Sequence, residues 1–183
     1  MRKLILTAFL LTLGFAAAGV RAGAVSPADQ KFFDDNIGKV VKPDPTPLAN
    51  PALAKMFTGR FYNVELNIAG AGEKIVVARE GNDLIAVTTP STTADMPGFP
   101  KLLKPDFRLK SDEDAHVLQD ALDVLYPIDD SFGGEDAQAK TIRHAGNVWT
   151  FVRGKFFEHF KGFVFTTDES GAVTKVQYSL DIK

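Results

Sequence analysis

Residues 156–182 read FFEHFKGFVFTTDESGAVTKVQYSLDI, and this stretch decides the fold class of the chain. Its second half alternates apolar and polar residues, and the apolar ones are Val176, Tyr178, Leu180 and Ile182. A period of two predicts a strand with one buried face and one solvent-facing face. Gly171, which can adopt a positive φ, predicts the turn, and the β-branched and aromatic run 163–167 predicts the partner strand. We therefore expect an antiparallel hairpin here.

The composition is that of an ordinary globular protein. The chain has 183 residues, 45% of them hydrophobic, with 15 glycines and 10 prolines. This length suits one domain, or two small halves that share a core. The formal net charge of -2 argues against a basic nucleic-acid-binding surface, so we expect no nucleic-acid partner.

The amino-terminal segment has the pattern of a secretory signal peptide. Arg2 and Lys3 form a charged start, and residues 4–18 are almost entirely apolar. Val20 and Ala22 then place small residues at the two positions that a signal peptidase reads. We expect residues 1–22 to be removed and the mature protein to be periplasmic or secreted. The alternative is an uncleaved membrane anchor, but the apolar run is short for a membrane span, so we expect no stable anchor to remain.

The sequence has no cysteine. Disulfides are therefore impossible, although the expected compartment would allow them, and a lipoprotein anchor, which needs a cysteine after the signal, is excluded. The mature protein must be stabilised by its hydrophobic core alone.

Residues 23–58 are expected to hold N-terminal helices and a proline-rich linker, ahead of an α+β domain at 59–183. Ser26 and Pro27 are typical of an N-cap and a first helical position. The run 42–47, with its three prolines, predicts a stiff extended linker that is neither helix nor ladder strand. A second short helix follows the linker.

From residue 59 the period of the apolar residues changes to two, which predicts strands. The strands expected before the terminal hairpin are 62–68, 74–79, 84–88, 140–144 and 148–153. Between them, the loop 89–100 is long enough for a functional or mobile segment. A main helix follows, with Ser111 as its N-cap. Its apolar stripe comprises Ala115, Leu118, Ala121, Leu122 and Leu125.

These elements predict an α+β protein with a mostly antiparallel, curved sheet or sheets packed against one or two helices. The strands are joined by connections of hairpin length, which favours antiparallel pairing. Two topologies fit the element order. One is a tandem arrangement of two helix-plus-four-strand units, and the other is a single curved sheet around one main helix, as in cystatin-like folds.

A cluster of aromatic side chains near the carboxyl end is the candidate ligand-binding region. The candidate residues are Trp149, Phe156, Phe157, His159, Phe160, Phe163 and Phe165. If 155–167 is one strand, bulky apolar groups lie on both of its faces, which requires cover on both sides or a bulge near Gly162. Such rings usually form core, and the functional alternative is the wall of an apolar cavity.

No catalytic residue, metal site or cofactor is predicted. The three histidines, His116, His144 and His159, have no metal-ligand spacing, and His116 lies off the apolar stripe of its helix. Acids at 129–136 surround two glycines and could hold calcium, but their spacing does not fit an EF-hand loop. No serine-nucleophile motif occurs.

The sequence predicts an exported, non-catalytic binding module that acts on a protein partner or an apolar small ligand, through the loop 89–100 and the aromatic stretch 156–165. One alternative is a small periplasmic enzyme with an acid–base residue in an apolar pocket, for which His159 and His144 are the best candidates. Another is an envelope inhibitor or structural module. An enzyme requires a histidine or carboxylate inside a cavity, a carrier requires an apolar cavity, and a protein-binding module requires an exposed apolar patch.

Overall fold

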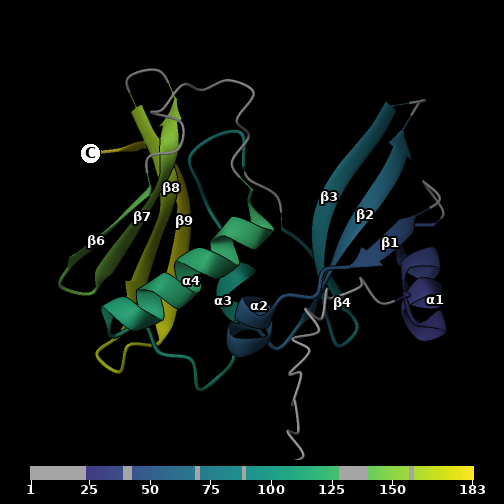
Figure 1. The fold of residues 1–183 in the computed structure, drawn as a ribbon, viewed down its shortest axis with the longest axis horizontal. Helices are drawn as coiled ribbons and strands as arrows, with labels where there is room; N and C mark the ends of the chain where they lie inside the picture. Colours follow the sequence, from purple (N-terminus) through teal and green to yellow (C-terminus); the bar gives the residue numbers. More distant parts are fainter. Residues whose placement is uncertain (1–23, 39–42, 69–70, 88–89, 128–139, 157–158) are drawn as a thin grey trace, which may run out of the picture.

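The protein has an α+β fold with two antiparallel sheets (Figure 1). The computed structural model describes residues 24–38, 43–68, 71–87, 90–127, 140–156 and 159–183. The N-terminal sheet has the order β1-β2-β3-β4, with strands β1 (Asp44–Pro47), β2 (Arg60–Ile68), β3 (Ala71–Glu80) and β4 (Asp83–Ala86). The C-terminal sheet has the order β5-β9-β8-β7-β6, with strands β5 (Ala94–Asp95), β6 (Lys140–Ala145), β7 (Val148–Phe156), β8 (His159–Thr167) and β9 (Val173–Ile182).

The helices are α1 (Pro27–Asn36), α2 (Pro51–Met56), α3 (Phe99–Leu102) and α4 (Asp112–Leu125). In Figure 1, α1 lies on the outer side of the N-terminal sheet, α2 and α3 lie between the sheets, and α4 crosses the C-terminal sheet. Strands β1–β4 follow α1, and strands β6–β9 follow α4. A single sheet for the whole chain is therefore wrong. The alternative of two helix-plus-four-strand units is correct in having two sheets, but β5, which precedes α4, makes the second sheet five-stranded.

Local capping signals place the two longer helices where the sequence predicts them. Ser26 accepts a hydrogen bond from the backbone N–H of Asp29 at 3.1 Å, and Pro27 takes the first position of α1. Ser111 and Asp114 form a reciprocal capping box at the start of α4. The predicted apolar stripe of α4 is buried along its whole length.

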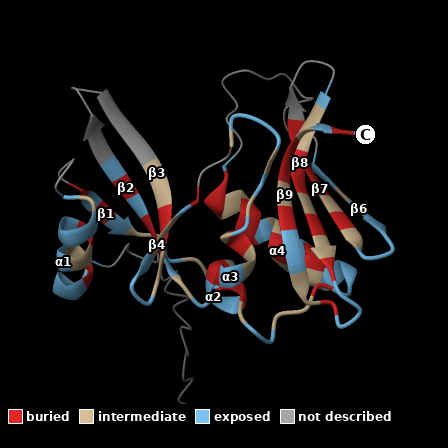
Figure 2. Ribbon diagram, turned by 180° about the vertical axis from the view of Figure 1, so that it is seen from behind, coloured by how far each residue is buried: buried red, intermediate tan, exposed pale blue. Residues whose placement is uncertain are grey.

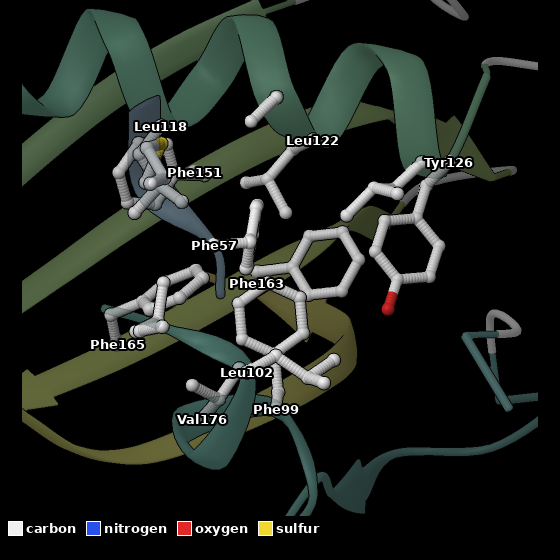
Figure 3. Close-up of a cluster of buried hydrophobic side chains, with 14 of the residues drawn as sticks. Phe57, Phe99, Leu102, Leu118, Leu122, Tyr126, Phe151, Phe163, Phe165 and Val176 are labelled. Atoms are coloured by element: carbon white, nitrogen blue, oxygen red, sulfur yellow. The ribbon is translucent and has the colours of Figure 1, made fainter. Parts of the chain in front are cut away.

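The main core lies between α4, the two short helices and the C-terminal sheet (Figures 2 and 3). Phe57 contacts Phe61 of β2 with ring centroids 5.1 Å apart, and it contacts Phe99 at 5.6 Å. Phe99 in turn contacts Phe165 of β8 at 5.6 Å. These edge-to-face contacts form an aromatic series, Phe61–Phe57–Phe99–Phe165, that connects one sheet to the other.

A second, smaller core lies between α1 and the N-terminal sheet. It comprises Phe33, Tyr62, Val64 and Val77. Strand side chains alternate between faces, so Tyr62 packs under α1 whereas its neighbour Phe61 packs in the main core. The start of β2 is therefore apolar on both faces, while Asn63 and Glu65 further along are exposed.

The prediction that the run 42–47 contains no ladder strand is wrong, because its residues 44–47 form β1 and pair with β2, Thr46 opposite Asn63. Prolines are tolerated on an edge strand where no donor is needed. The N–H of Leu48 donates to the carbonyl of Phe61 at 2.8 Å, which directs the N–H groups at alternate positions toward β2. Pro45 and Pro47 occupy the intervening positions, which face away from the sheet.

The terminal hairpin is confirmed as β8 paired with β9, and Gly171 adopts a φ of 81° in its turn. Val176, Tyr178 and Ile182 are buried, and Leu180 is half-buried. Ser179, expected on the solvent face, is also buried. It lies opposite Gly162, next to a shift in the strand register between Gly162 and Phe160.

Residues 155–167 do not form one strand. Phe156 ends β7 and pairs with His159, the first residue of the antiparallel strand β8. Within β8, the register against β9 shifts between Phe160 and Gly162. A β-carbon at Gly162 would lie 1.9 Å from the carbonyl oxygen of Phe151, so only glycine allows the strands to approach this closely.

The loop 89–100 is partly structural framework. Ala94 and Asp95 form β5 and pair with β9, and Phe99 begins α3 with only 3% of its surface exposed. Pro100 lies within α3, so the end of the predicted loop is helical. This part of the chain packs on the core, so fewer residues of the predicted loop are free to bind a partner.

Candidate functional site

An apolar groove of about 450 Å³ lies beside α2. All of its lining residues come from one continuous segment, 47–62, which runs from the end of β1 through α2 to the start of β2. Its apolar walls include Pro47, Leu48, Pro51, Leu53, Ala54 and Phe61. Ligand pockets commonly have volumes of about 300–1,000 Å³ and apolar linings. The groove falls within that class.

Several hydrogen bonds hold this segment in shape. The bond from Leu48 N–H to the Phe61 carbonyl closes it at one end. The side-chain oxygen of Asn50 caps α2 by accepting from the N–H of Ala52 at 2.8 Å, and the Lys104 ammonium donates to the carbonyl of Ala54 at 2.7 Å. Prolines at either side of the groove restrict the backbone further. The groove is therefore formed before any ligand arrives.

The floor and the rim of the groove differ in exposure. Leu53 and Phe61 are buried and form the floor, whereas Ala54 and Ala49 on the rim are exposed. None of the described residues that line the groove carries an imidazole or a carboxylate. This lining favours retention of an apolar group by burial and offers no acid–base pair for catalysis.

Two of the residues that line the groove, Arg60 and Tyr62, have polar side chains. Arg60 forms an ion pair with Asp29 of α1, and Tyr62 forms a hydrogen bond with it. The Asp29 carboxylate, 4% exposed, accepts from Arg60 Nη1 at 2.9 Å and from Arg79 Nη1 at 2.5 Å. It also accepts from the hydroxyl of Ser26 at 2.7 Å. These bonds fix the first turn of α1 to β2 and β3.

The ionisation states of this cluster follow from its contacts. Burial alone would raise the pKa of Asp29, but hydrogen bonds from Ser26 and Tyr62 and the charges of Arg60 and Arg79 outweigh burial and lower it. Burial, together with the hydrogen bond to Asp29, raises the pKa of Tyr62 to about 12. Asp29 is therefore a carboxylate at neutral pH, and the Tyr62 hydroxyl stays protonated and donates to it.

The described aromatic candidates from the sequence do not line this groove. Trp149, Phe163 and Phe165 are 2%, 1% and 0% exposed and lie in the main core, the last two near Tyr126 and Phe99 (Figure 3). Phe160 is half-buried and pairs with Ile182.

Two further candidates are only partly placed. The backbone of Phe156 lies in β7, but its side chain is not among the parts that the structure describes. Phe157 lies outside the described residues. We therefore assign neither a place in a binding site.

The candidate histidines lie on the surface. His159 is exposed, with Nδ1 3.1 Å from Oδ1 of Asp181. His144 stacks on Trp149 with ring centroids 3.8 Å apart, and its Nε2 lies 2.6 Å from the carbonyl oxygen of Gly146. His116 is exposed on α4, as expected. These positions do not provide the buried acid–base residue that the enzyme hypothesis requires.

The described residues contain no group of three or more His, Cys, Asp or Glu that could hold a metal ion. The acidic loop considered for calcium, 129–136, lies outside them. None of the described helices is long and apolar enough to cross a membrane.

A second polar cluster fixes α4 to the C-terminal sheet. The buried Arg153 guanidinium forms an ion pair with Asp123 and donates to the carbonyl of Tyr126 at 2.5 Å. Burial lowers the pKa of Arg153, although Asp123 opposes that effect. Asp123 also receives the Lys140 ammonium at 2.9 Å. Both partners of the guanidinium lie on or next to α4, so we assign this cluster a structural role.

The sequence did not predict the groove, because residues 42–47 were interpreted as a linker that packs against nothing. Leu48, an apolar residue between Pro47 and Pro51, was the available signal, since a solvated linker has no need of one. The link from Asp29 to Arg60 and Arg79 spans 31 and 50 residues of sequence, and no local pattern marks it.

Comparisons with known proteins identify no relative. No protein-family model matches the chain, no curated protein matches it significantly, and no solved structure matches its fold significantly. The assignment of function therefore depends on the geometry of the site.

Proposed function

We propose that this protein is an exported, non-catalytic binding module that holds a small apolar ligand in the groove formed by residues 47–62. The observation that carries the proposal is the groove itself, which is open to solvent, apolar and already formed. Its floor residues Leu53 and Phe61 belong to the main core, so the binding surface is continuous with the rigid part of the fold.

The physical basis of binding is burial of apolar surface at low reorganisation cost. Transfer of apolar surface from water is worth about 25 cal/mol per Å². Proline residues and the α2 cap restrict the groove before binding, which reduces the entropy that association must overcome. Export is supported by the signal-like pattern of residues 1–22, which would place the groove outside the cytoplasm.

Nile red, a neutral dye that fluoresces in apolar surroundings, tests the proposal in a titration of the native protein. We expect saturable binding that Ala54→Glu weakens by about tenfold, because a charge on the rim disfavours an apolar ligand. Ala145→Glu is the matched control, since Ala145 is an exposed alanine of β6 in the other sheet. This control should bind the dye like the wild type.

Two outcomes would contradict the proposal. The first is absence of saturable dye binding by the folded protein. The second is dye binding that Ala54→Glu leaves intact but Phe160→Ala removes, which would place the site in the aromatic stretch 156–165.

A further inference from the structure

The groove has an excess of positive charge at one place. Arg60 and Arg79 share the single carboxylate of Asp29, so one positive charge of the trio is not neutralised. Glu80 is the next acid along β3, with its carboxylate beside Gly59, and within the described part of the chain it forms no ion pair with either arginine. The three groups Asp29, Arg60 and Arg79 together carry one positive charge, and the Glu80 carboxylate beside Gly59 offsets part of it without pairing with either arginine.

The two arginines are not equivalent. The side chain of Arg79 is 16% exposed, stacks over the Phe32 ring at 4.0 Å, and donates through Nε to the carbonyl of Gly81 at 3.2 Å. The side chain of Arg60 is 63% exposed and its hydrogen bond to Asp29 uses Nη1. A guanidinium has five N–H donors in a planar fork. Arg60 is thus the member of the trio that solvent, or a ligand, can reach.

Asp29 holds Arg60 in place. Its carboxylate also accepts from the Ser26 hydroxyl at 2.7 Å, and Ser26 caps the first turn of α1, so the acceptor of the Arg60 guanidinium is itself held by that turn. Arg60 and Tyr62 line the same groove as Leu53 and Phe61. A groove with an apolar lining and one exposed cation among its lining residues is complementary to a molecule that carries an anionic head group on an apolar body.

We propose that the ligand of this groove is an amphipathic anion, whose apolar part lies over Leu53 and Phe61 and whose carboxylate, sulfate or phosphate head binds the Arg60 guanidinium. This inference rests on the proposed function and adds the chemical class of the ligand. Tyr62 takes no direct part in head-group binding, because its hydroxyl donates to Asp29.

The test compares probes that share a tail and differ in the head group. Decanoate, decanol and decyltrimethylammonium are titrated against the wild type by displacement of Nile red at low salt. We expect decanoate to bind about tenfold more tightly than decanol, since a charge-assisted hydrogen bond is worth about that factor, and the cationic probe to bind most weakly. Raising the salt concentration should weaken decanoate binding selectively.

Arg60→Met keeps the aliphatic stem of the side chain and removes its charge. It should reduce decanoate affinity about tenfold and leave decanol affinity within about twofold, so decanol binding also reports that the groove is intact. Arg143→Met is the matched control. Arg143 is an exposed arginine of β6 whose guanidinium donates to the carbonyl of Lys183, far from the groove in sequence. That variant should change neither affinity.

Unchanged decanoate affinity in Arg60→Met would overturn the inference, and so would an equal loss of decanoate and decanol. In the first case, decanol binding that Ala54→Glu weakens would leave the proposed function standing. Absence of binding by all three probes in the wild type would overturn both proposals.

Discussion

At the scale of single residues, Asp29 determines how α1 is attached to the N-terminal sheet. Its carboxylate is almost fully buried yet accepts from two guanidiniums and two hydroxyls. Buried charges are tolerated when they are paired and hydrogen-bonded, and removal of one partner leaves the others uncompensated. The stability of the α1 attachment should therefore depend on this side chain far more than on the surface charges of the same helix.

We expect Asp29→Asn to lower the free energy of unfolding by about 2–3 kcal/mol, because Arg79 would lose its carboxylate partner in a largely buried position. Urea unfolding at neutral pH measures the effect. Asp35→Asn is the control on the same helix, since the ion pair of Asp35 with Lys31 is exposed. Equal stability of the two variants would contradict the role assigned to Asp29.

The same contacts predict a pH dependence. The pKa of Asp29 in the folded protein is lowered, because its hydrogen bonds and the two arginines outweigh the effect of burial. Its contribution to stability is therefore fully present above the unfolded pKa of about 3.9 and is lost as the pH falls through the folded pKa. The difference in stability between wild type and Asp29→Asn should be constant from about pH 5 to pH 7 and shrink at more acidic pH. A difference that grows on acidification would contradict this assignment.

The caps show what residue-level patterns can and cannot predict. Ser26 and Ser111 bond to groups three residues away, so their role was readable from the sequence. Asp29 was readable only as an acid in the first turn of a helix. Its partners Arg60 and Arg79 lie on other elements, and only the pairing of β2 with β3 brings them together.

At the scale of elements, the position of a strand in its sheet decides what its sequence can contain. β1 contains two prolines and still pairs with β2, because an edge strand needs donors on one side only. The prediction that prolines exclude a paired strand holds for a central strand. That β1 is an edge strand follows only from the sheet order, which the sequence does not show. The alternation in β9 and the stripe in α4 predicted their elements correctly, since both are periodic over many residues.

At Gly162, strand β8 lies too close to the backbone of β7 for a β-carbon to fit. We expect Gly162→Ala to lower the free energy of unfolding by at least about 3 kcal/mol, because its β-carbon would overlap the carbonyl of Phe151. Gly146→Ala is a useful comparison: Gly146 has a φ of 62° and open space around it, so the cost there is backbone strain of about 1–2 kcal/mol. Urea unfolding of both variants measures the difference. Similar losses would show that close approach at Gly162 is not the constraint.

At the scale of the whole molecule, the aromatic series Phe61–Phe57–Phe99–Phe165 joins the two sheets. Its rings come from β2, from the end of α2, from α3 and from β8, and each touches the next edge to face. The four-stranded and five-stranded sheets are therefore not separate bodies, and the main core includes residues of both. The sequence indicated that two halves could share a core, but not which rings would connect them.

Phe99→Ala should weaken that connection. We expect a loss of about 3–5 kcal/mol in the free energy of unfolding, because a buried phenyl ring is removed from between two others. Trp149, the single tryptophan, reports on the C-terminal sheet by fluorescence, and far-ultraviolet circular dichroism reports on the whole chain. The two signals should coincide in the wild type and separate in Phe99→Ala. Phe99→Leu, which conserves more volume, should lose less stability and keep the signals together.

The prolines of β1 have a consequence for the behaviour of the protein in concentrated solution. Strand-to-strand association between molecules needs amide hydrogens on the outer margin of a sheet, and Pro45 and Pro47 have none to give. A neighbouring polypeptide that docked there would leave its own carbonyls unsatisfied. The β1 edge of the sheet therefore disfavours the addition of strands from other molecules. This protects a protein that has no disulfide bond to stabilise its fold.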